Sequence, residues 1–275
     1  MIGNEPAADL VVKLGGTRGV EWEAACEDLA AVIHQGTRVI VVHGGSAETN
    51  RMAEALGHPP RFVTSPSGYV SRFTDRETLE IFAMVTAGRL SSILVEALQK
   101  RGVNALGLSG ADGRLIVAQR KEAVRSLQEG KVLLLHGDHT GTIREVDGDL
   151  LRRLLQAGYT PVIAPLAISP QGELLNVDAD RAAAAVASNL GVKTLILLTA
   201  APGLLHRFPD ESTLLSFLPR AQLPEALEFA QGGMKKKILG ASEALQGGVA
   251  RVILGDGRVD HPITYALSGG GTSIT

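Results

Sequence analysis

Lys13 and the two glycines close behind it, Gly15 and Gly16, form the stretch of this sequence best suited to binding phosphate. The apolar run 10–14 predicts a buried strand that the glycines end. Glycines in such a turn leave backbone N–H groups open, and a lysine beside them adds positive charge, so the turn suits a polyphosphate. This stretch alone could equally be a strand with a tight turn, so the assignment depends on the rest of the chain.

Other charged residues lie near glycines or helix starts farther along the chain. The basic run 235–237 follows Gly233, and Asp180 directly precedes the alanine-rich helical pattern 181–190. The sequence has no Walker-type glycine-lysine loop, Gly-x-Gly-x-x-Gly, paired-cysteine or His-Glu-x-x-His site, or Gly-x-Ser-x-Gly elbow. Phosphoryl transfer is therefore favoured over hydride transfer, zinc hydrolysis and acyl-serine chemistry. Asp180 could instead cap its helix, and the lysines could form a solvated helix face.

The elements that must position these residues alternate between strands and helices. The run 38–42 predicts a second buried strand, and it too leads into glycines, Gly44 and Gly45. A strand, a helix over 20–35 and a second strand form a right-handed parallel unit, so both glycine turns should lie at the same carboxyl edge of one sheet. This alternation continues along the chain and predicts an α/β protein with a mainly parallel sheet.

The middle of the chain predicts other features. Residues 57–73 contain three prolines and are predicted to be an exposed loop. Thr74 and Glu77 have capping-box spacing, which predicts a helix from there to about Arg101. A helix of that length suggests a homodimer interface, although a core helix bent near Gly88 is equally compatible. Short apolar runs within 114–146 predict hairpins, with turns at 129–130 and 138–141.

Composition limits the functional classes. The 275 residues are 45% hydrophobic, enough for one large α/β domain or two lobes that share a sheet. A net charge of −2 disfavours general nucleic-acid binding, and the single cysteine, Cys26, cannot form an internal disulfide. Residues 1–8 are predicted to be a loose extension without a leader pattern, and no 18-residue apolar run occurs. We therefore expect a cytoplasmic protein that does not bind a membrane.

Five segments, in their order and spacing, resemble the amino acid kinase family and within it the acetylglutamate kinase branch. The resemblance covers nearly the whole chain from Asp9 to Thr275. Segments 43–50, 57–62 and 202–205 more closely resemble the aminoadipate kinases of lysine biosynthesis, whose substrate is held by a small acidic amino-group carrier protein. Ser46 stands where acetylglutamate kinases usually have a third glycine. The five segments are Lys13–Gly16, Val42–Gly45, Arg72–Asp75, Asn176–Asp180 and Gly233–Lys237.

The resemblance implies a three-layer α/β/α sandwich around one continuous sheet. We expect an N-lobe, 9–175, that binds the acceptor and dimerises through the long helix 74–101, and a C-lobe, 176–275, that binds ATP. The resemblance also implies that MgATP phosphorylates a side-chain carboxylate to give an acylphosphate. A carboxylate is already ionised at neutral pH, so this chemistry requires alignment and positive charge rather than a general base.

The resemblance assigns a role to each motif residue. Lys13 and Lys237 would contact the phosphates, and Asp180 would hold both ammonium groups in place. No protein ligand for a metal is implied, so Mg²⁺ would be bound mainly through the nucleotide phosphates. Relatives usually have an aspartate near Ala200, which puts the usual adenosine contacts in doubt. The other implied residues are Gly15 and Gly16 for phosphate, and Gly44, Gly45, Arg72 and Asn176 for the acceptor.

Three alternatives remain open at the level of sequence. The acceptor could be free N-acetylglutamate in arginine biosynthesis, or carrier-linked glutamate instead of aminoadipate. The chain could also be a non-catalytic ligand-binding or regulatory member of the family, although Lys13, Asp180 and the glycine turns are all retained. Segment 114–131 has five basic and two acidic residues, which predicts that it attracts an acidic carrier, unless it is simply a solvated hairpin.

Overall fold

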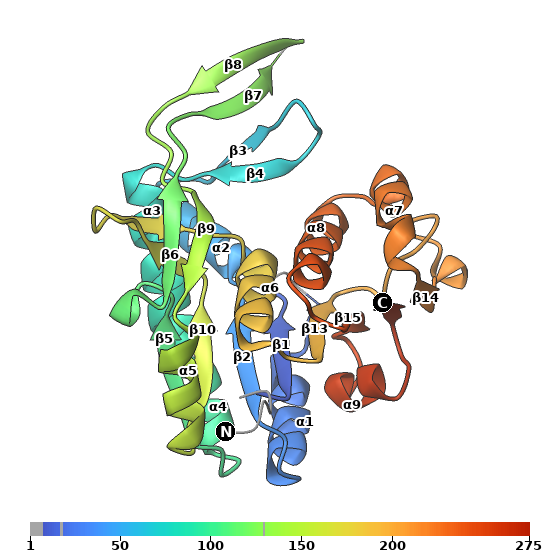
Figure 1. Ribbon diagram of the computed structural model, residues 1–275. Coiled ribbons are helices and arrows are strands. Elements are labelled where there is room, and N and C mark those ends of the chain that lie inside the picture. Colours follow the sequence, from blue (N-terminus) through green and yellow to red (C-terminus); the bar gives the residue numbers. More distant parts are fainter. Residues whose placement is uncertain (1–7, 17–18, 129) are drawn as a thin grey trace.

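The computed structural model describes residues 8–16, 19–128 and 130–275, and within them the chain forms a three-layer α/β/α sandwich (Figure 1). The central sheet has the strand order β14-β16-β15-β13-β1-β2-β10-β5. The six strands from β15 to β5 are parallel to one another, and β16 pairs with β15 in the antiparallel direction. The predicted fold class is therefore confirmed. In sheet order, the strands cover Phe217–Leu218, Thr272–Ile274, Arg251–Asp256, Thr194–Thr199, Leu10–Leu14, Val39–His43, Thr160–Ala164 and Ala105–Ser109.

Helices cover both faces of this sheet. Successive side chains of a strand point to opposite faces, and in β1 Leu10, Val12 and Leu14 pack with α1, α4 and α9. Val11 faces the other way and packs with α5, α6 and α8. Lys13 has the same parity as Val11, so the alternation directs it toward α6 and α8. The helices are α1 Trp22–His34, α2 Ser46–Ala55, α3 Arg76–Ala83, α4 Ser91–Gln99, α5 Gly148–Gln156, α6 Ala179–Leu190, α7 Leu223–Phe229, α8 Gly233–Gln246 and α9 Pro262–Leu267.

Smaller β elements lie over the carboxyl edge of the central sheet (Figure 1). A four-stranded sheet has the order β12-β11-β6-β9, and two hairpins, β3–β4 and β7–β8, extend beyond it. The predicted hairpins within 114–146 are confirmed as β6 to β9, although Glu129 lies outside the described residues. These strands are Leu174–Asn176, Leu166–Ile168, Ile116–Arg120, Gly141–Val146, Arg61–Thr64, Val70–Phe73, Val124–Gln128 and Lys131–Leu135.

The prediction of an exposed loop over 57–73 was wrong, because β3 and β4 form an antiparallel hairpin there. The prolines flank the strands: Pro59 and Pro60 precede β3, and Pro66 lies in the connecting turn. Cross-strand cation–π contacts stabilise the hairpin, with the Arg72 guanidinium carbon 5.4 Å from the Phe62 ring centroid. The packing of β3 against β7 adds a tertiary contact that sequence patterns do not show.

The predicted helix from Thr74 to Arg101 is present but differs at its start and middle. Asp75, not Thr74, caps it by accepting the Thr78 N–H at 2.8 Å. A π-helical turn over Met84–Leu90, which includes Gly88, separates α3 from α4. The segment Arg76–Gln99 is long and apolar enough to cross a membrane. Core helices of soluble proteins pass the same test, so this is weak evidence for a membrane span. One face packs in the protein core, where Leu79, Leu94 and Leu98 are fully buried.

A buried aspartate joins α1 to α9. Asp28 accepts the Ile263 and Thr264 N–H groups at 2.6 and 2.8 Å and the Thr264 hydroxyl at 2.6 Å. The carboxylate thereby satisfies donors at the start of a short helix whose own N-cap residue, His261, makes no side-chain cap. Of the predicted N-terminal extension, only Ala8 is described, and it is buried; residues 1–7 lie outside the described residues.

Candidate active site

Three charged side chains from distant parts of the chain meet above the carboxyl end of β1. The Lys13 ammonium lies 2.8 Å from Asp180 Oδ1, and the Lys237 ammonium donates a hydrogen bond to Asp180 Oδ2 at 3.0 Å. The contact with Lys13 is an ion pair without hydrogen-bond geometry at Oδ1. All three side chains are at most 13% exposed. The structure therefore brings together the three residues for which the sequence implied phosphate chemistry.

Small residues allow helices α6 and α8 to approach β1 and each other. Ala183 and Ala187 of α6 are fully buried in the core under the sheet. A methyl group on Gly240 of α8 would lie 3.2 Å from the Asp180 carbonyl oxygen, so glycine permits the close packing of α8 on α6. Asp178, rather than Asp180, is the N-cap of α6 and accepts the Asp180 and Arg181 N–H groups. Asp180 is thus free to face the lysines from the first helical turn.

Burial and mutual attraction set the protonation of this triad. Burial alone would raise the pKa of Asp180, but attraction to Lys13 and Lys237 outweighs it and holds the pKa well below its usual range. Burial lowers the pKa of Lys13; Asp180 opposes this shift, while repulsion from Lys237 adds to it. Burial also disfavours charge on Lys237, but attraction to Asp180 raises the pKa. Two buried cations therefore share one anion, an arrangement that favours a further negative charge.

The two glycine turns lie against each other beside the triad, as predicted. β1 pairs in parallel with β2, and the Gly44 N–H donates to the Leu14 carbonyl at 3.0 Å. A methyl group on Gly44 would lie 2.9 Å from the Gly16 nitrogen, and one on Gly16 would collide with the Gly44–Gly45 backbone. Only glycine fits where these backbones approach. Burial lowers the pKa of His43 to about 4, so this residue adds no positive charge at neutral pH.

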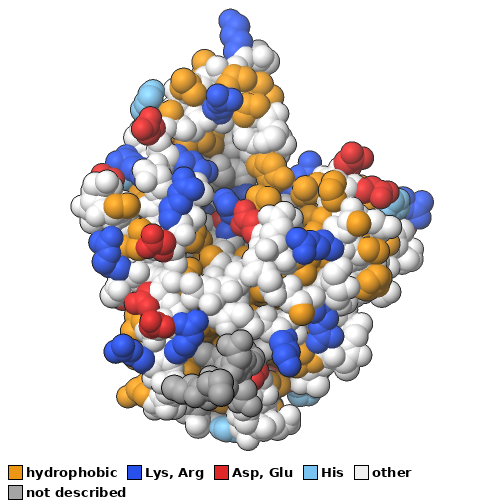
Figure 2. All heavy atoms as spheres, viewed as in Figure 1, with side chains coloured by type: hydrophobic (Ala, Val, Ile, Leu, Met, Phe, Trp, Pro, Cys, Tyr) orange, Lys and Arg blue, Asp and Glu red, His pale blue; other side chains and the backbone are white. Residues whose placement is uncertain are grey.

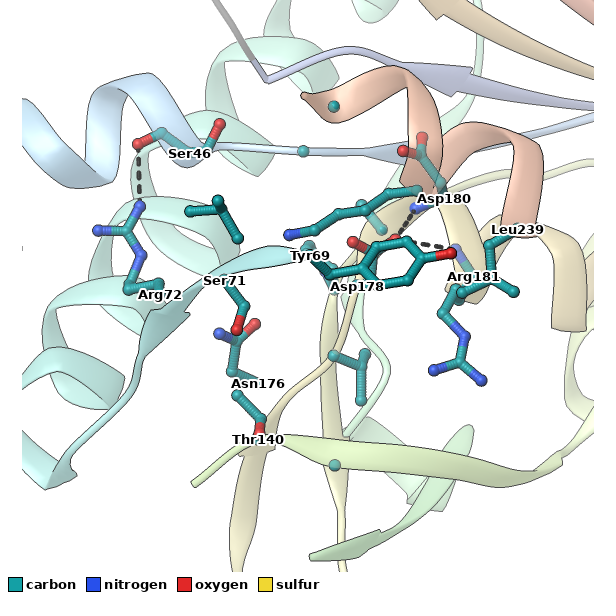
Figure 3. Close-up of a pocket in the computed structure, with 18 of the residues that line it drawn as sticks. Ser46, Tyr69, Ser71, Arg72, Thr140, Asn176, Asp178, Asp180, Arg181 and Leu239 are labelled. Carbon is teal, nitrogen blue, oxygen red and sulfur yellow. Dashed lines mark hydrogen bonds between the residues drawn. The ribbon is translucent and has the colours of Figure 1, made fainter. Parts of the chain in front are cut away.

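A cavity of about 810 Å³ connects the triad to the predicted acceptor residues (Figure 3). Figure 2 shows the corresponding hollow, with basic and acidic side chains together inside it. Figure 3 shows Arg72 at one end, Asp180 at the other, and Asn176 between them. The cavity residues that bear on the site are Lys13, Gly16, Gly44, Gly45, Tyr69, Ser71, Arg72, Lys121, Arg125, Thr140, Asn176, Asp178, Asp180, Gly233, Lys236 and Lys237.

Arg72 is a buried cation with unused hydrogen-bonding capacity. Its Nη2 donates to the Ser46 carbonyl at 3.2 Å, while Nη1 is buried without a hydrogen-bond partner. Burial lowers the pKa of Arg72, and no carboxylate of the described residues pairs with its guanidinium. Arginine nevertheless stays protonated. A planar guanidinium in this state is suited to a carboxylate ligand.

Asn176 lies in the wall of the same cavity, where its Nδ2 donates to Thr74 Oγ1 at 3.0 Å. The cavity also contains Tyr69, Ser71 and Thr140, which lie outside the five motif segments. Tyr69 lies beside the turn of the β3–β4 hairpin, so recognising that hairpin would have pointed to it. Ala200 follows β13, and its methyl group lies beside Gly19, so the side chain at this position offers no carboxylate.

The structure changes one expectation about segment 114–131. Arg120 is engaged: it donates to the Asp138 carbonyl at 3.0 Å and pairs with Glu173 at 3.1 Å. Lys121 and Arg125, by contrast, line the cavity. Arg120 is therefore a structural residue, and the basic residues available to a ligand are its neighbours. Within the described ranges, no group of three or more His, Cys, Asp or Glu side chains could hold a metal ion.

Comparisons with known proteins agree with this architecture. The model of the amino acid kinase family matches residues 10–256. The chain is 55% identical over 266 residues to a [LysW]-aminoadipate kinase of Deinococcus radiodurans, covering 97% of this chain and 91% of that protein. It is 53% identical over 267 residues to a protein of the same name from Thermus thermophilus, covering 96% and 99%.

A solved structure agrees as well. The chain superposes with a TM-score of 0.79 and 29% identity on N-acetylglutamate synthase from Neisseria gonorrhoeae complexed with coenzyme A and N-acetyl-glutamate. The match covers 98% of this chain and 59% of that one. The family model spans nearly all of the sheet, both glycine turns and the triad of Lys13, Asp180 and Lys237. This chain therefore belongs to the amino acid kinase family.

Proposed function

We propose that this protein transfers the γ-phosphoryl group of ATP to the side-chain carboxylate of L-2-aminoadipate held by a small acidic carrier protein. The observation that carries the proposal is one continuous cavity with the Lys13–Asp180–Lys237 triad at one end and unpaired Arg72 at the other. Relatives at 53% and 55% identity are named as kinases of carrier-linked aminoadipate. A relative from Nitrosopumilus maritimus at 42% identity is named as a putative kinase of the aminoadipate and glutamate forms, so glutamate and arginine biosynthesis remain within the proposal.

The proposed reaction needs charge compensation more than proton transfer. A carboxylate oxygen attacks the γ-phosphorus, the bond to the β-phosphate bridging oxygen breaks, and ADP leaves with that electron pair. The nucleophile is ionised at neutral pH, so no base is required. Both reactants are anions, and charge develops on the transferred group and on ADP. Lys13 and Lys237 can offset that charge because Asp180 fixes both in a buried, preorganised position.

The cavity residues fit a nucleotide phosphate chain. Gly16, Gly44 and Gly45 of the two glycine turns line the cavity at the carboxyl edge of the sheet, where their backbone can contact a phosphate. The N-terminus of α8 begins at Gly233 in the same cavity. We propose that Mg²⁺ enters with the phosphates and is held mainly by them. The acceptor would bind through its main-chain carboxylate to Arg72 and through polar groups to Asn176 and the Gly44–Gly45 backbone.

We further propose that segment 9–175 binds the acceptor and that segment 176–275 binds ATP. The helix over 74–101 would form a homodimer interface, which is supported by exposed apolar side chains at Met84 and Ile93. We also expect a cytoplasmic location. Sedimentation equilibrium at micromolar concentration tests the dimer, because a single monomeric species would contradict it.

An acylphosphate trap tests the activity directly. The protein is incubated with MgATP, hydroxylamine and one acceptor at a time: carrier-linked aminoadipate, carrier-linked glutamate or free N-acetylglutamate. We expect hydroxamate from carrier-linked aminoadipate, with kcat/KM at least tenfold above that for N-acetylglutamate. A preference for free N-acetylglutamate would identify an acetylglutamate kinase instead. No hydroxamate from any acceptor would favour a non-catalytic binding member of the family.

The second test concerns the acidic carrier. Lys121 and Arg125 line the cavity, and Arg125 belongs to the β7–β8 hairpin, on which apolar side chains are also exposed (Figure 2). Reversing both to glutamate should raise KM for the carrier-linked acceptor about tenfold at low salt, because the new charges repel the carrier. The difference should shrink at high salt, where such interactions are screened. Arg207→Glu, on an exposed loop outside the cavity, is the control. Equal kinetics for all three proteins would rule out this surface.

A further inference from the structure

We infer that Asp138 is a positioning residue that holds the acceptor end of the cavity in its binding shape, an inference that rests on the proposed function. Asp138 lies between β8 and β9 and is 1% exposed. No Lys, Arg or His nitrogen of the described residues lies within 4.0 Å of its carboxylate. A buried carboxylate without a cationic partner is costly unless hydrogen bonds stabilise it. Its hydrogen bonds therefore indicate its role.

The Asp138 carboxylate joins two segments that are far apart in sequence. Oδ1 accepts the Thr74 N–H at 2.8 Å, just after β4 ends. Oδ2 accepts the Thr140 N–H at 3.0 Å and also the Thr140 hydroxyl. Hydrogen bonds to an ionised acceptor are stronger than those between neutral groups, so this carboxylate fixes the two segments relative to each other.

The residue after Asp138 extends the connection to a third segment. The His139 N–H donates to the Thr74 carbonyl at 2.7 Å, and the Asn176 N–H donates to the His139 carbonyl at 2.9 Å. Asn176 Nδ2 donates a further hydrogen bond to Thr74 Oγ1 at 3.0 Å. The end of β4, the start of β9 and the end of β12 are thus joined in one closed network around Asp138.

Each of the three segments supplies a side chain to the acceptor end of the cavity. Arg72 lies two residues before Thr74, and Figure 3 shows Thr140 and Asn176 close together in the cavity wall. None of the hydrogen bonds in the network involves Lys13, Asp180 or Lys237. Disturbing Asp138 should therefore move the acceptor residues and leave the phosphate end intact. The predicted consequence is a selective loss of acceptor affinity.

Asp138→Asn tests this inference. The side chain keeps its size, but one oxygen becomes an NH₂ donor that cannot accept the Thr74 or the Thr140 N–H. We expect KM for the carrier-linked acceptor to rise about tenfold, which corresponds to the binding free energy lost with one hydrogen bond to a buried charge. KM for ATP should stay within about twofold of its value in the unaltered protein. Equal increases in both KM values, or no increase in either, would overturn the inference. No acylphosphate from the unaltered protein would instead contradict the proposed function.

The chain offers a matched control in Asp28. This buried carboxylate also accepts two backbone N–H groups and one threonine hydroxyl, but it joins α1 to α9 outside the cavity. Asp28→Asn should lower Tm about as much as Asp138→Asn while leaving both KM values unchanged. If it raises KM for the acceptor as much as Asp138→Asn does, general destabilisation explains the effect and the positioning role is wrong.

Thr140 provides a second test that also applies if Asp138→Asn does not fold. Thr140→Val removes one donor to Asp138, whereas Thr140→Ser keeps the hydroxyl. We expect Thr140→Val to raise KM for the acceptor severalfold and Thr140→Ser, which keeps the donor to Asp138, to raise it clearly less. Where Asp138→Asn folds, adding Thr140→Val should raise KM no further, because both changes disturb one network. Fully additive effects, or no effect of Thr140→Val, would contradict the inference.

Discussion

Replacing Lys13 with methionine should lower kcat about 10²–10³-fold, the range measured when one preorganised charge-stabilising donor is removed. Methionine keeps an unbranched side chain of similar length but cannot offset charge that develops on the phosphoryl group and ADP. Lys237→Met should lower kcat by a similar factor, because Lys13 and Lys237 each contact one of the two carboxylate oxygens of Asp180. The measurement is kcat in the hydroxamate assay, with circular dichroism to confirm that each variant is folded.

Lys235 is the matched control for this prediction. It belongs to the same basic run of α8 but does not line the main cavity. Lys235→Met should therefore change kcat less than about threefold. If Lys13→Met and Lys237→Met both retain nearly full kcat for phosphorylation of the acceptor, the two ammonium groups do not stabilise the transition state. In that case the proposed site would be wrong.

Replacing Asp180 with asparagine should have the largest effect on stability. The change leaves two buried ammonium groups facing each other without the shared anion. Removing one partner of a buried ion pair costs roughly 3–5 kcal/mol, so we expect a loss of that size in the free energy of unfolding. Urea denaturation measures it. Asp178→Asn is the control, because asparagine caps a helix about as well as aspartate and the loss should be below about 1 kcal/mol.

The contribution of Asp180 also depends on pH in a defined direction. The folded-state pKa is held below its usual range by Lys13 and Lys237, whereas the unfolded-state pKa is about 3.9. The unfolded chain therefore binds the proton first as the pH falls. The stabilisation is fully present above about pH 5 and is lost progressively below it. The stability difference between the unaltered protein and Asp180→Asn should shrink on acidification. A difference that stays constant between pH 6 and pH 3 would contradict this account.

Local sequence patterns identified the sheet and the charged residues of the candidate site. The apolar runs of β1 and β2 specify strands buried on both faces, and Lys13 is the one charged residue within the run of β1. Glycines after both strands indicate where backbones approach, and the order of five short segments indicates the family. These features depend on neighbouring residues or on the resemblance, so they can be recognised without coordinates.

The tertiary structure decided which of several similar residues takes each role. Asp178 and Asp180 both lie at the start of α6, and only the positions of Lys13 and Lys237 give Asp180 the ion pairs and leave the cap to Asp178. Thr74 has capping-box spacing, but its hydroxyl accepts a hydrogen bond from Asn176, 102 residues away, and donates to the Arg72 carbonyl, so Asp75 caps the helix instead.

The sequence by itself therefore determined the α/β class, the family and the residue types available for phosphoryl transfer. It did not determine the β3–β4 hairpin, the structural role of Arg120 or the network around Asp138. The physical reason is the range of the interactions. Strand burial and helix periodicity arise within a few residues, whereas a buried polar group is paired by whichever donors the folded chain brings to it, often from distant segments.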